Sequence, residues 1–321
     1  MAATVPAPPL ELANRVGAIE HSEDPLELYE MLGRESRDQI VSMLPEDWSF
    51  DGKRVLDFGC GSGRTLRHFL DEAERGEFWG CDIDGKSITW LRQHLSPPIH
   101  AFPNAPIPPV SQPNGSFDLV YAISVFTHLT DTWSEWLLDL HRLLSDDGFL
   151  IATYMGEAMS EWLASEPWME DRIGMNVLRS WQGWDQGGPL VLHSDWWIRA
   201  HWGRAFEIVD VVHQPEMGGE LGRHSWAILR KRPGHFTAAD LEEFEPGEER
   251  EIKALRHNIS QLQSEVATQV TQREAEADDL RERLEQTIGL LESTTAGYEE
   301  SASWRMTKPL RTLAQRRRAR G

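Results

Sequence analysis

Short apolar segments alternate with amphipathic segments between residues 50 and 232. The apolar runs have the length of strands and are separated by residues that favour turns. Strands are predicted at Arg54–Phe58, Phe78–Ile83, Ile99–Phe102, Phe117–Ala122, Phe149–Tyr154, Phe206–Val212 and Ser225–Arg230. Helical spacing is present at Thr65–Ala73, Lys86–His94 and Thr132–Leu144. Strands that alternate with helices favour a mostly parallel sheet covered on both faces, so we predict a doubly wound α/β fold.

A different periodicity begins at Ile252. Apolar residues then recur every three and four positions, which is a heptad seam. After a phase slip of four residues the seam resumes at Ala277; its members are Ile252, Leu255, Ile259, Leu262, Val266, Ala277, Leu280, Leu284 and Leu291. We expect a coiled coil that makes the chain a homo-oligomer. The alternative is a single charged helix packed on the body.

These patterns divide the chain into five parts. We predict an N-terminal helical segment (1–45), a main domain (46–232), an acidic linker (233–249), the coiled coil (250–297) and a basic tail (298–321). Within the main domain, a Trp-rich insertion is expected at about 156–202, after the fifth strand. The chemistry of the chain is therefore expected in residues 46–232.

Charge is distributed unevenly along the chain. The net charge is −20, and residues 301–321 contain seven cations and no acidic residue. Residues 1–300 therefore carry the difference between −20 and +7, which is −27. A body this acidic repels phosphate backbones, so nucleic acid is not expected as a partner. Only the tail favours an anionic surface.

The compartment is predicted from three features. The apolar runs are too short to span a membrane, and the first residues lack the basic and apolar regions of a secretory signal. Two cysteines, Cys60 and Cys81, cannot build a disulfide framework or a four-thiolate zinc site. We expect a cytoplasmic protein, with the tail holding it at the inner face of the plasma membrane.

The strongest motif is RVLDFGCGSGRTLRHFL. A strand runs into Gly59, Gly61 and Gly63, where small residues allow the backbone to approach a ligand. Asp82 ends the next strand, about 20 residues later, where a carboxylate suits ribose hydroxyls. A nicotinamide dinucleotide or S-adenosylmethionine fits this geometry. Asp57, two residues before the first glycine, favours the cationic methionine end of S-adenosylmethionine over a pyrophosphate.

The segments VLDFGCGSGR, GCDID, FDLVYAISVFTHL and LHRLLSDDGFL together resemble the class I S-adenosylmethionine-dependent methyltransferases, over about residues 26–230. The resemblance implies a seven-stranded sheet whose last strand is antiparallel, with S-adenosylmethionine as the cofactor. The cofactor residues that we expect from the motifs and the resemblance are Asp57, Gly59, Cys60, Gly61, Gly63, Asp82, Ile83, Asn104 and Ser124. Asp57 and the glycines would line the methionine moiety, Ile83 would pack on the adenine, and Asn104 would meet the adenine amino group.

Two histidines are candidates for the base that a hydroxyl acceptor needs. His128 follows the fourth strand in VFTHL, and His193 lies in VLHSDWW. A packing role is the alternative for each of them. Tyr29 and Arg34 in the preceding helix would cover the cofactor, or else belong to an ordinary amphipathic helix. The carboxylates and histidines share no ligand spacing, so no metal site is predicted.

Tryptophan is concentrated in the predicted insertion. Seven residues lie within 41 positions: Trp162, Trp168, Trp181, Trp184, Trp196, Trp197 and Trp202. Indole rings suit the faces of sugars, so we expect one or two of them in an acceptor pocket. The others are expected to form the core of a small subdomain.

The C-terminal segment SASWRMTKPLR resembles a short element that follows coiled coils in bacterial enzymes of surface-polysaccharide assembly, including glycosyltransferases and attached methyltransferases. This likeness predicts a methyltransferase that O-methylates a sugar of a surface glycan or its precursor. Alternatives are a methyltransferase for a small metabolite, and a non-catalytic module that docks a glycosyltransferase. The cations and apolar residues of the tail also suit an anionic membrane.

Overall fold

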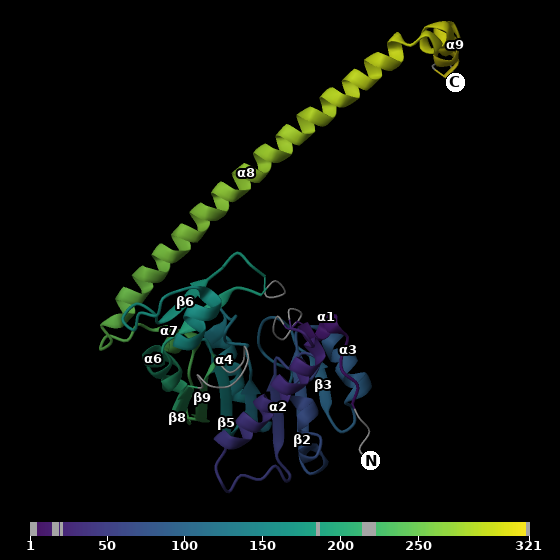
Figure 1. Cartoon of the computed structure of the whole chain (residues 1–321). Helices are drawn as coiled ribbons and strands as arrows, with labels where there is room; N and C mark the ends of the chain where they lie inside the picture. The colour runs from purple at the N-terminus through teal and green to yellow at the C-terminus, as the bar shows by residue number, and fades with distance from the viewer. Residues whose placement is uncertain (1–4, 15–18, 20–21, 184–186, 214–222, 319–321) are drawn as a thin grey trace. The chain divides into compact units, whose positions relative to one another are not determined.

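The computed structural model describes residues 5–14, 19, 22–183, 187–213 and 223–318, with residues 312, 313 and 316–318 described by their backbone alone. A seven-stranded sheet forms the centre of the chain, in the order β3-β2-β1-β4-β5-β9-β8 (Figure 1). Its strands are β1 (Arg54–Phe58), β2 (Glu77–Asp82), β3 (His100–Pro103), β4 (Phe117–Ala122), β5 (Leu144–Tyr154), β8 (Phe206–His213) and β9 (Ser225–Lys231). Neighbours are parallel except β9, which is antiparallel to both β5 and β8. The predicted fold, including the antiparallel last strand, is confirmed.

Helices cover both faces of this sheet (Figure 1). One face packs against α1 (Leu10–Ala13), α2 (Pro25–Met43) and α3 (Gly85–His94). The other packs against α4 (Trp133–Leu143), α6 (Asp195–Ala205) and α7 (Ala238–Glu242). Neighbouring strand residues such as Val55 and Leu56 are therefore both buried, on opposite faces. This explains why the central strands are continuous apolar runs without polar alternation.

Side-chain caps mark where several helices begin. Asp24 accepts a hydrogen bond from the amide of Glu27 at the start of α2. Asp84 accepts from the amides of Lys86 and Ser87 at the start of α3. These caps satisfy amides that have no partner within the helix, and they set the direction in which each helix leaves its strand.

The predicted helix over residues 65–73 is wrong. Two short 3₁₀ helices, η3 (Leu66–His68) and η4 (Glu72–Glu74), occupy this segment. The buried guanidinium of Arg67 turns inward and donates to the carbonyls of Val5 and Pro6. Contacts with other segments thus decide between an α-helix and 3₁₀ helices here. The amphipathic period of the sequence specifies only which side of the segment is apolar.

A small hairpin lies between β5 and α6. It contains α5 (Glu157–Met159), the π-helical turn η5 (Ser160–Ala164) and the antiparallel pair β6 (Met175–Leu178) and β7 (Leu190–His193). Its core is aliphatic and is formed by Met155, Met159, Ile173, Leu178, Leu190 and Leu192. The tryptophans divide instead into exposed ones, Trp162 and Trp181, the partly buried Trp168, and those of α6, which belong to the main core. Trp184 lies outside the described residues.

The chain separates into two units, residues 1–262 and 263–321. Helix α8 (Arg250–Glu300) begins in the first unit, where Glu251, Ala254 and Asn258 are buried. The amide of Asn258 bonds to both the N–H and the carbonyl of Val177 in β6, so it pairs with the edge of the hairpin as a strand would. The first turns of α8 are therefore an integral part of the main body.

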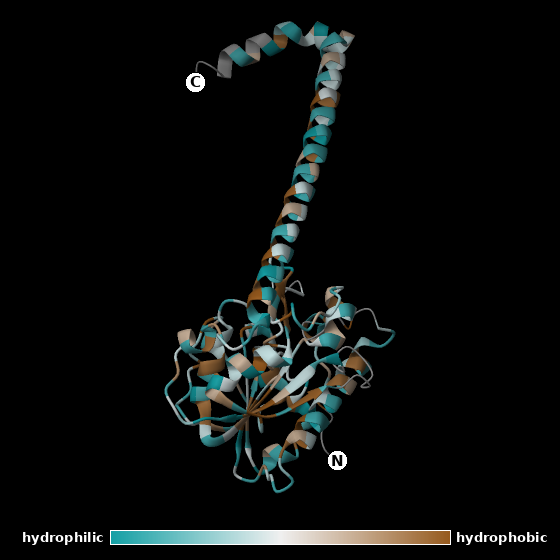
Figure 2. Cartoon of the chain, turned by 90° about the vertical axis from the view of Figure 1, so that its left-hand side faces the viewer, coloured by the Kyte–Doolittle hydropathy of each residue, from teal (hydrophilic) through white to brown (hydrophobic). Residues whose placement is uncertain are grey.

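The second unit consists of the remainder of α8 and α9 (Ala302–Arg318). Hydrophobic residues recur along α8 between hydrophilic ones (Figure 2). Residues 233–249, for which a linker was predicted, contain α7, and its Leu241 is fully buried. Among the described residues, no helix is both long and apolar enough to cross a membrane.

Candidate cofactor and acceptor site

The glycine loop follows β1 at the carboxyl edge of the sheet. Gly59, Gly61 and Gly63 all have positive φ values, of 81°, 53° and 84°. A Cβ atom on Gly59 would lie 2.5 Å from the Val125 side chain, so only glycine fits this position. The amides of Gly59 and Cys60 both donate to the carbonyl of Cys81, at 2.8 and 3.0 Å. The loop is thereby held against the end of β2.

Asp82 stands where β2 ends, directly beside this loop. One carboxylate oxygen accepts from the amide of Gly61 at 2.8 Å, and the other accepts from the amide of Asp84 at 2.7 Å. These two main-chain amides set the orientation of the carboxylate. Ile83, the next residue, is 39% exposed, which is unusual for a large apolar side chain beside a strand end.

Asp57 is the most perturbed carboxyl group of the site. It is buried at the end of β1, and its pKa is raised from 3.8 to about 8, mainly by this burial. The Asp82 carboxylate contributes to the rise, whereas the Tyr121 hydroxyl and the Arg64 guanidinium oppose it. A cation bound beside Asp57 would favour the ionised form. The group is therefore suited to the positively charged methionine end of S-adenosylmethionine.

Asn104 lies beyond β3 and next to Asp82. Its amide N–H donates to the carbonyl of Asp82 at 3.1 Å, and its side-chain nitrogen donates to Ala105. Its side-chain oxygen is buried and has no hydrogen-bond partner among the described residues. An unpaired buried acceptor is costly, and an amino group of a ligand would satisfy it. This orphaned oxygen fits the adenine amino group that the resemblance places here.

Helix α2 packs directly on the glycine loop. The Tyr29 hydroxyl lies 2.9 Å from Ser62 Oγ, and a Cβ atom on Gly33 would lie 2.2 Å from the carbonyl oxygen of Arg64. Arg34, by contrast, is exposed. Gly33 was not singled out in the sequence, where the only signal is a glycine inside a helical pattern. Its role is to let the helix approach the loop.

Ser124 follows β4 and has a backbone strain uncommon outside glycine. Its φ is +57°, its amide donates to Thr153 Oγ1 at 2.7 Å, and its hydroxyl lies 3.2 Å from Thr127 Oγ1. Both threonines are fully buried, so this turn is held by the core beneath it. Strained residues that the surrounding structure holds in place are found mainly at functional sites.

His128 lies four residues beyond Ser124 and is oriented by the hairpin. Its Nδ1 is 2.7 Å from the carbonyl oxygen of Pro189. A carbonyl only accepts, so Nδ1 carries the proton and Nε2 retains a lone pair. Burial lowers the pKa of the ring, so it is neutral near pH 7. His128 thus has the tautomer and the charge of a general base.

His193 lies in a different environment. Its ring is fully buried against Tyr154, Trp197 and Trp202, and neither nitrogen has a hydrogen-bond partner among the described residues. Burial lowers its pKa to about 3, which keeps it neutral. A ring enclosed in this way has no open path to an acceptor.

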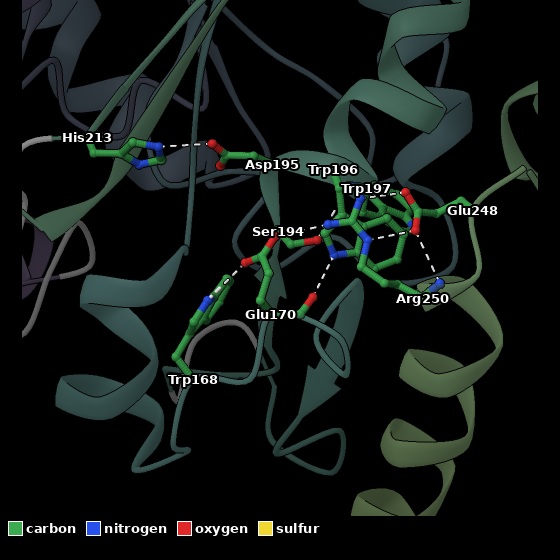
Figure 3. A network of polar contacts seen from close by, with 9 residues as sticks. All are labelled: Trp168, Glu170, Ser194, Asp195, Trp196, Trp197, His213, Glu248 and Arg250. Atoms are coloured by element: carbon green, nitrogen blue, oxygen red, sulfur yellow. Dashed lines mark hydrogen bonds and ion pairs between the residues drawn. The ribbon is translucent and has the colours of Figure 1, made fainter.

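A further polar group at the same edge was missed by sequence reasoning. Asp195 accepts from the Tyr154 hydroxyl at 2.5 Å and lies 3.0 Å from His213 Nε2, while His213 Nδ1 lies 2.9 Å from Ser225 Oγ. Figure 3 shows the imidazole of His213 directed at Asp195. The strand register places Ser225 opposite both Tyr154 and His213, which are distant in the sequence. Only the pairing of β9 with β5 and β8 assembles them.

Known proteins resemble this chain in sequence or in fold. A family described as "Methyltransferase domain" matches residues 56–150. The chain is similar to the crystal structure of a SAM-dependent methyltransferase from Aquifex aeolicus, with 13% identity, a TM-score of 0.43 and coverage of 67% of this chain and 97% of that one. It is also similar to the PH0226 protein from Pyrococcus horikoshii OT3, with 15% identity, a TM-score of 0.46 and coverage of 68% and 96%. An S-adenosylmethionine-dependent methyltransferase from Mesorhizobium loti gives 20% identity, a TM-score of 0.42 and coverage of 60% and 96%.

The matched family and the sheet order define the class. Residues 56–150 match a methyltransferase domain within this Rossmann-like sheet, and S-adenosylmethionine is its cofactor. Within the described part of the chain, no cluster of three or more His, Cys, Asp or Glu side chains could hold a metal ion.

The buried carboxyl of Asp57 makes stability depend on pH. Because its pKa is about 8 in the folded chain and 3.8 as the unperturbed value, the folded state keeps a proton that the unfolded state loses. This contribution therefore falls as pH rises from about 4 to about 8. We expect Asp57→Asn to have a higher free energy of unfolding in urea than the parent protein. The difference should be a few kcal/mol at pH 8 and far less at pH 4.5, since one pKa unit is worth about 1.4 kcal/mol. The same variant should bind S-adenosylmethionine more weakly in calorimetry.

Asp131→Asn is the matched control, since Asp131 is exposed. It should change neither the pH dependence nor the affinity. A stability difference between Asp57→Asn and the parent that stays constant from pH 4.5 to 8 would show that the carboxyl is not perturbed.

Proposed function

We propose that the chain transfers the methyl group of S-adenosylmethionine to a hydroxyl of a sugar, on a surface glycan or its precursor. Asp57 and the loop 59–63 would hold the methionine end, Asp82 the ribose, and Ile83 and Asn104 the adenine. Ser124 would face the reacting centre. The observations that support these roles are the shared edge of the sheet, the engaged carboxylate of Asp82 and the unpaired oxygen of Asn104.

The orientation of His128 carries the proposal of a hydroxyl acceptor. S-adenosylmethionine supplies a methyl group on a sulfonium, and a hydroxyl that receives it must lose a proton. His128 has a neutral ring whose Nε2 accepts, because Pro189 holds the opposite nitrogen. His193 is not proposed as the base, because its ring is enclosed.

Two exposed tryptophans support a sugar as the acceptor. Trp162 and Trp181 are 40% and 48% exposed, and both belong to the segment between β5 and α6. The guanidinium of Arg223 lies 5.0 Å from the ring centre of Trp162. Flat indole faces beside a cation suit a sugar ring that carries acidic groups. The C-terminal element that resembles those of polysaccharide-assembly enzymes supports the same acceptor class.

The test is a transfer assay with labelled S-adenosylmethionine, combined with mass spectrometry of surface glycans from cells with and without the gene. A glycan that loses one methyl group per repeat without the gene supports the proposal. Transfer only to small metabolites would support the alternative enzyme. Cofactor binding without transfer to any acceptor would indicate a docking module.

A substitution of His128 separates a base from a packing residue. We expect His128→Asn to keep the hydrogen bond to Pro189, because its side-chain nitrogen replaces Nδ1, and to lose the acceptor at Nε2. The transfer rate should fall by about 10²–10⁴-fold with unchanged affinity for S-adenosylmethionine. The rate of the parent enzyme should rise with pH, with its midpoint below the ordinary pKa of a histidine, since burial lowers the pKa of the ring. Equal rates for the variant and the parent would rule out His128 as the base.

We also propose that α8 joins two or more copies of the chain. The seam residues remain exposed on the isolated helix; Leu280, for example, is 67% exposed. Heptad seams of this kind pack against another helix, and an identical copy presents the same seam. Exposed apolar stripes of this length are unusual on an isolated chain.

The structure defines where the chain should be cut to test this. A protein ending at Leu262 retains Ala254 and Asn258, which are buried in the first unit. We expect it to be smaller in light scattering than the full chain and to bind S-adenosylmethionine equally well. The double variant Leu280→Lys, Leu284→Lys should dissociate the full chain, whereas Glu282→Lys with Gln286→Lys, on the opposite side of the helix, should not. An unchanged assembly state after the cut would contradict the proposal.

The tail is proposed to hold the enzyme at an anionic membrane. Trp304, Met306 and Leu310 are exposed on α9 among the cations, and Arg311 lies 3.6 Å from the ring centre of Trp304. The side chains of Leu313 and of the cations at 316–318 and 320 lie outside the described residues. Such a mixture of cations and apolar groups suits the headgroup region, at about 1 kcal/mol per cation.

Liposome co-sedimentation tests the tail. The full chain should sediment with phosphatidylserine vesicles at low salt and much less at high salt, because salt screens the attraction. Neutral phosphatidylcholine vesicles and a chain lacking residues 301–321 are the controls. Equal sedimentation with and without the tail would refute membrane binding and leave a protein partner, such as a glycosyltransferase.

A further inference from the structure

The hairpin of β6 and β7 lies between two segments that are distant from each other in the sequence. Val177 of β6 is paired with Val191 of β7 in an antiparallel register. In such a ladder, alternate residue pairs direct their backbone groups away from the partner strand. Val177 directs its N–H and its carbonyl to Asn258 at the start of α8 (Figure 1). On the other edge, the N–H of Val191 donates to the carbonyl of Thr127 at 2.9 Å. The hairpin therefore joins α8 to the turn that precedes His128.

The side chain of Asn258 is held at both of its polar atoms. Its oxygen accepts from the N–H of Val177 at 3.1 Å, and its nitrogen donates to the carbonyl of Val177 at 2.8 Å. The same nitrogen donates to Gln261 Oε1 at 3.3 Å, and that oxygen also accepts from Asn176 at 3.0 Å. Asn258 is buried, so its loss would leave two backbone groups of Val177 without this partner. The amide thus fixes β6 at one place along α8.

Contacts at the edges of the hairpin decide where it lies, because a hairpin of two strands has little stability of its own. The end of β7 is attached to the main sheet, where the N–H of His193 donates to the carbonyl of Met155 at 2.8 Å. Pro189 lies at the other end of β7, directly before Leu190. The position of its carbonyl therefore depends on how both edges of the hairpin are held, and Asn258 holds one of them.

This carbonyl sets the protonation of His128. Its oxygen lies 2.7 Å from His128 Nδ1, so Nδ1 carries the proton and Nε2 keeps a lone pair. A displacement of the hairpin by about 1 Å would break the bond, because hydrogen bonds weaken beyond about 3.2 Å. The imidazole would then no longer be restricted to one tautomer, since the hydrogen bond at one ring nitrogen determines the state of the other.

We propose that Asn258 is a positioning residue for His128. Through Val177 and the hairpin, it holds the Pro189 carbonyl that selects the tautomer of the ring. The inference rests on the proposed role of His128 as the base in methyl transfer. It makes the start of α8 a part of the acceptor side of the enzyme, although Asn258 acts only through the backbone of the hairpin.

NMR of the full chain labelled with ¹⁵N in histidine tests the positioning directly. The signal of the His128 Nδ1–H is identified by its absence from His128→Asn. Asn258→Leu has a similar volume and no polar side-chain atom. We expect it to weaken this signal through faster exchange with water, and to move both ring nitrogens toward the shifts of a mixture of tautomers. The affinity for S-adenosylmethionine in calorimetry should stay the same. An unchanged His128 signal in Asn258→Leu would overturn the proposal.

The transfer rate separates this inference from the proposed function. With surface glycans from cells that lack the gene as the acceptor, Asn258→Leu should lower the rate by about tenfold to a hundredfold, as expected for a displaced catalytic group. A changed His128 signal with an unchanged rate would support the positioning by Asn258 and contradict the role of His128 as the base.

His257→Ala is the matched control. His257 is the neighbour of Asn258 on α8 and lies 3.2 Å from Glu166, so the variant removes a contact of the same helix with a segment outside the hairpin strands. It should change neither the His128 signal nor the rate. Should Asn258→Leu fail to fold, Asn258→Asp takes its place. Its carboxylate still accepts from the N–H of Val177 but cannot donate to the carbonyl, so the signal should change in the same direction. Equal effects of the control and the Asn258 variants would refute the positioning role.

Discussion

The close approach of main-chain segments at the carboxyl edge of the sheet is the constraint on which the cofactor site depends. The glycine loop lies against the end of β2 through two amides that share the carbonyl of Cys81. On its other side, α2 approaches so closely that a methyl group at Gly33 would overlap the carbonyl of Arg64. Glycine is required where backbones meet at this distance, because a side chain would need space that the packing does not leave. The position of Asp82 follows from the same contact, since its carboxylate accepts from the amide of Gly61.

Several titratable side chains of the protein are buried. Asp57, His193 and His201 are all removed from water, and in each case burial shifts the pKa toward the neutral form. Such groups cost folding free energy unless a partner satisfies them. At Asp57, a cationic ligand would stabilise the ionised carboxylate and offset the free energy lost by burying it. The unfavourable burial in the free protein therefore adds to the free energy of ligand binding.

Helix α8 belongs to both units of the chain. Its first turns complete the body, where Asn258 pairs with the backbone of β6 and His257 lies 3.2 Å from Glu166. Beyond Leu262 the same helix is charged and carries only an exposed apolar stripe. Because the hairpin that orients His128 through Pro189 also contacts α8 through Val177, the base of the helix supports the proposed acceptor side of the domain.

The sequence by itself determined the α/β class, the glycine loop and the acidic residue after β2, because these depend on local patterns. Apolar runs indicate strands that are buried on both faces of the sheet. Glycines directly after a strand indicate a tight backbone turn. The winding of residues 65–73 was not determined in this way, since contacts of Arg67 with a distant segment decide it.

Only the tertiary structure decided which polar side chains meet. The tautomer of His128 depends on Pro189, the enclosure of His193 depends on three aromatic rings, and the His213–Asp195–Tyr154 group depends on strand register. The contact between His201 and Glu251 likewise joins two helices that are separated by α7 in the chain. The physical reason is that hydrogen bonds and desolvation act over a few ångströms in space. The periodicity of the sequence does not specify which distant residues come within that distance of each other.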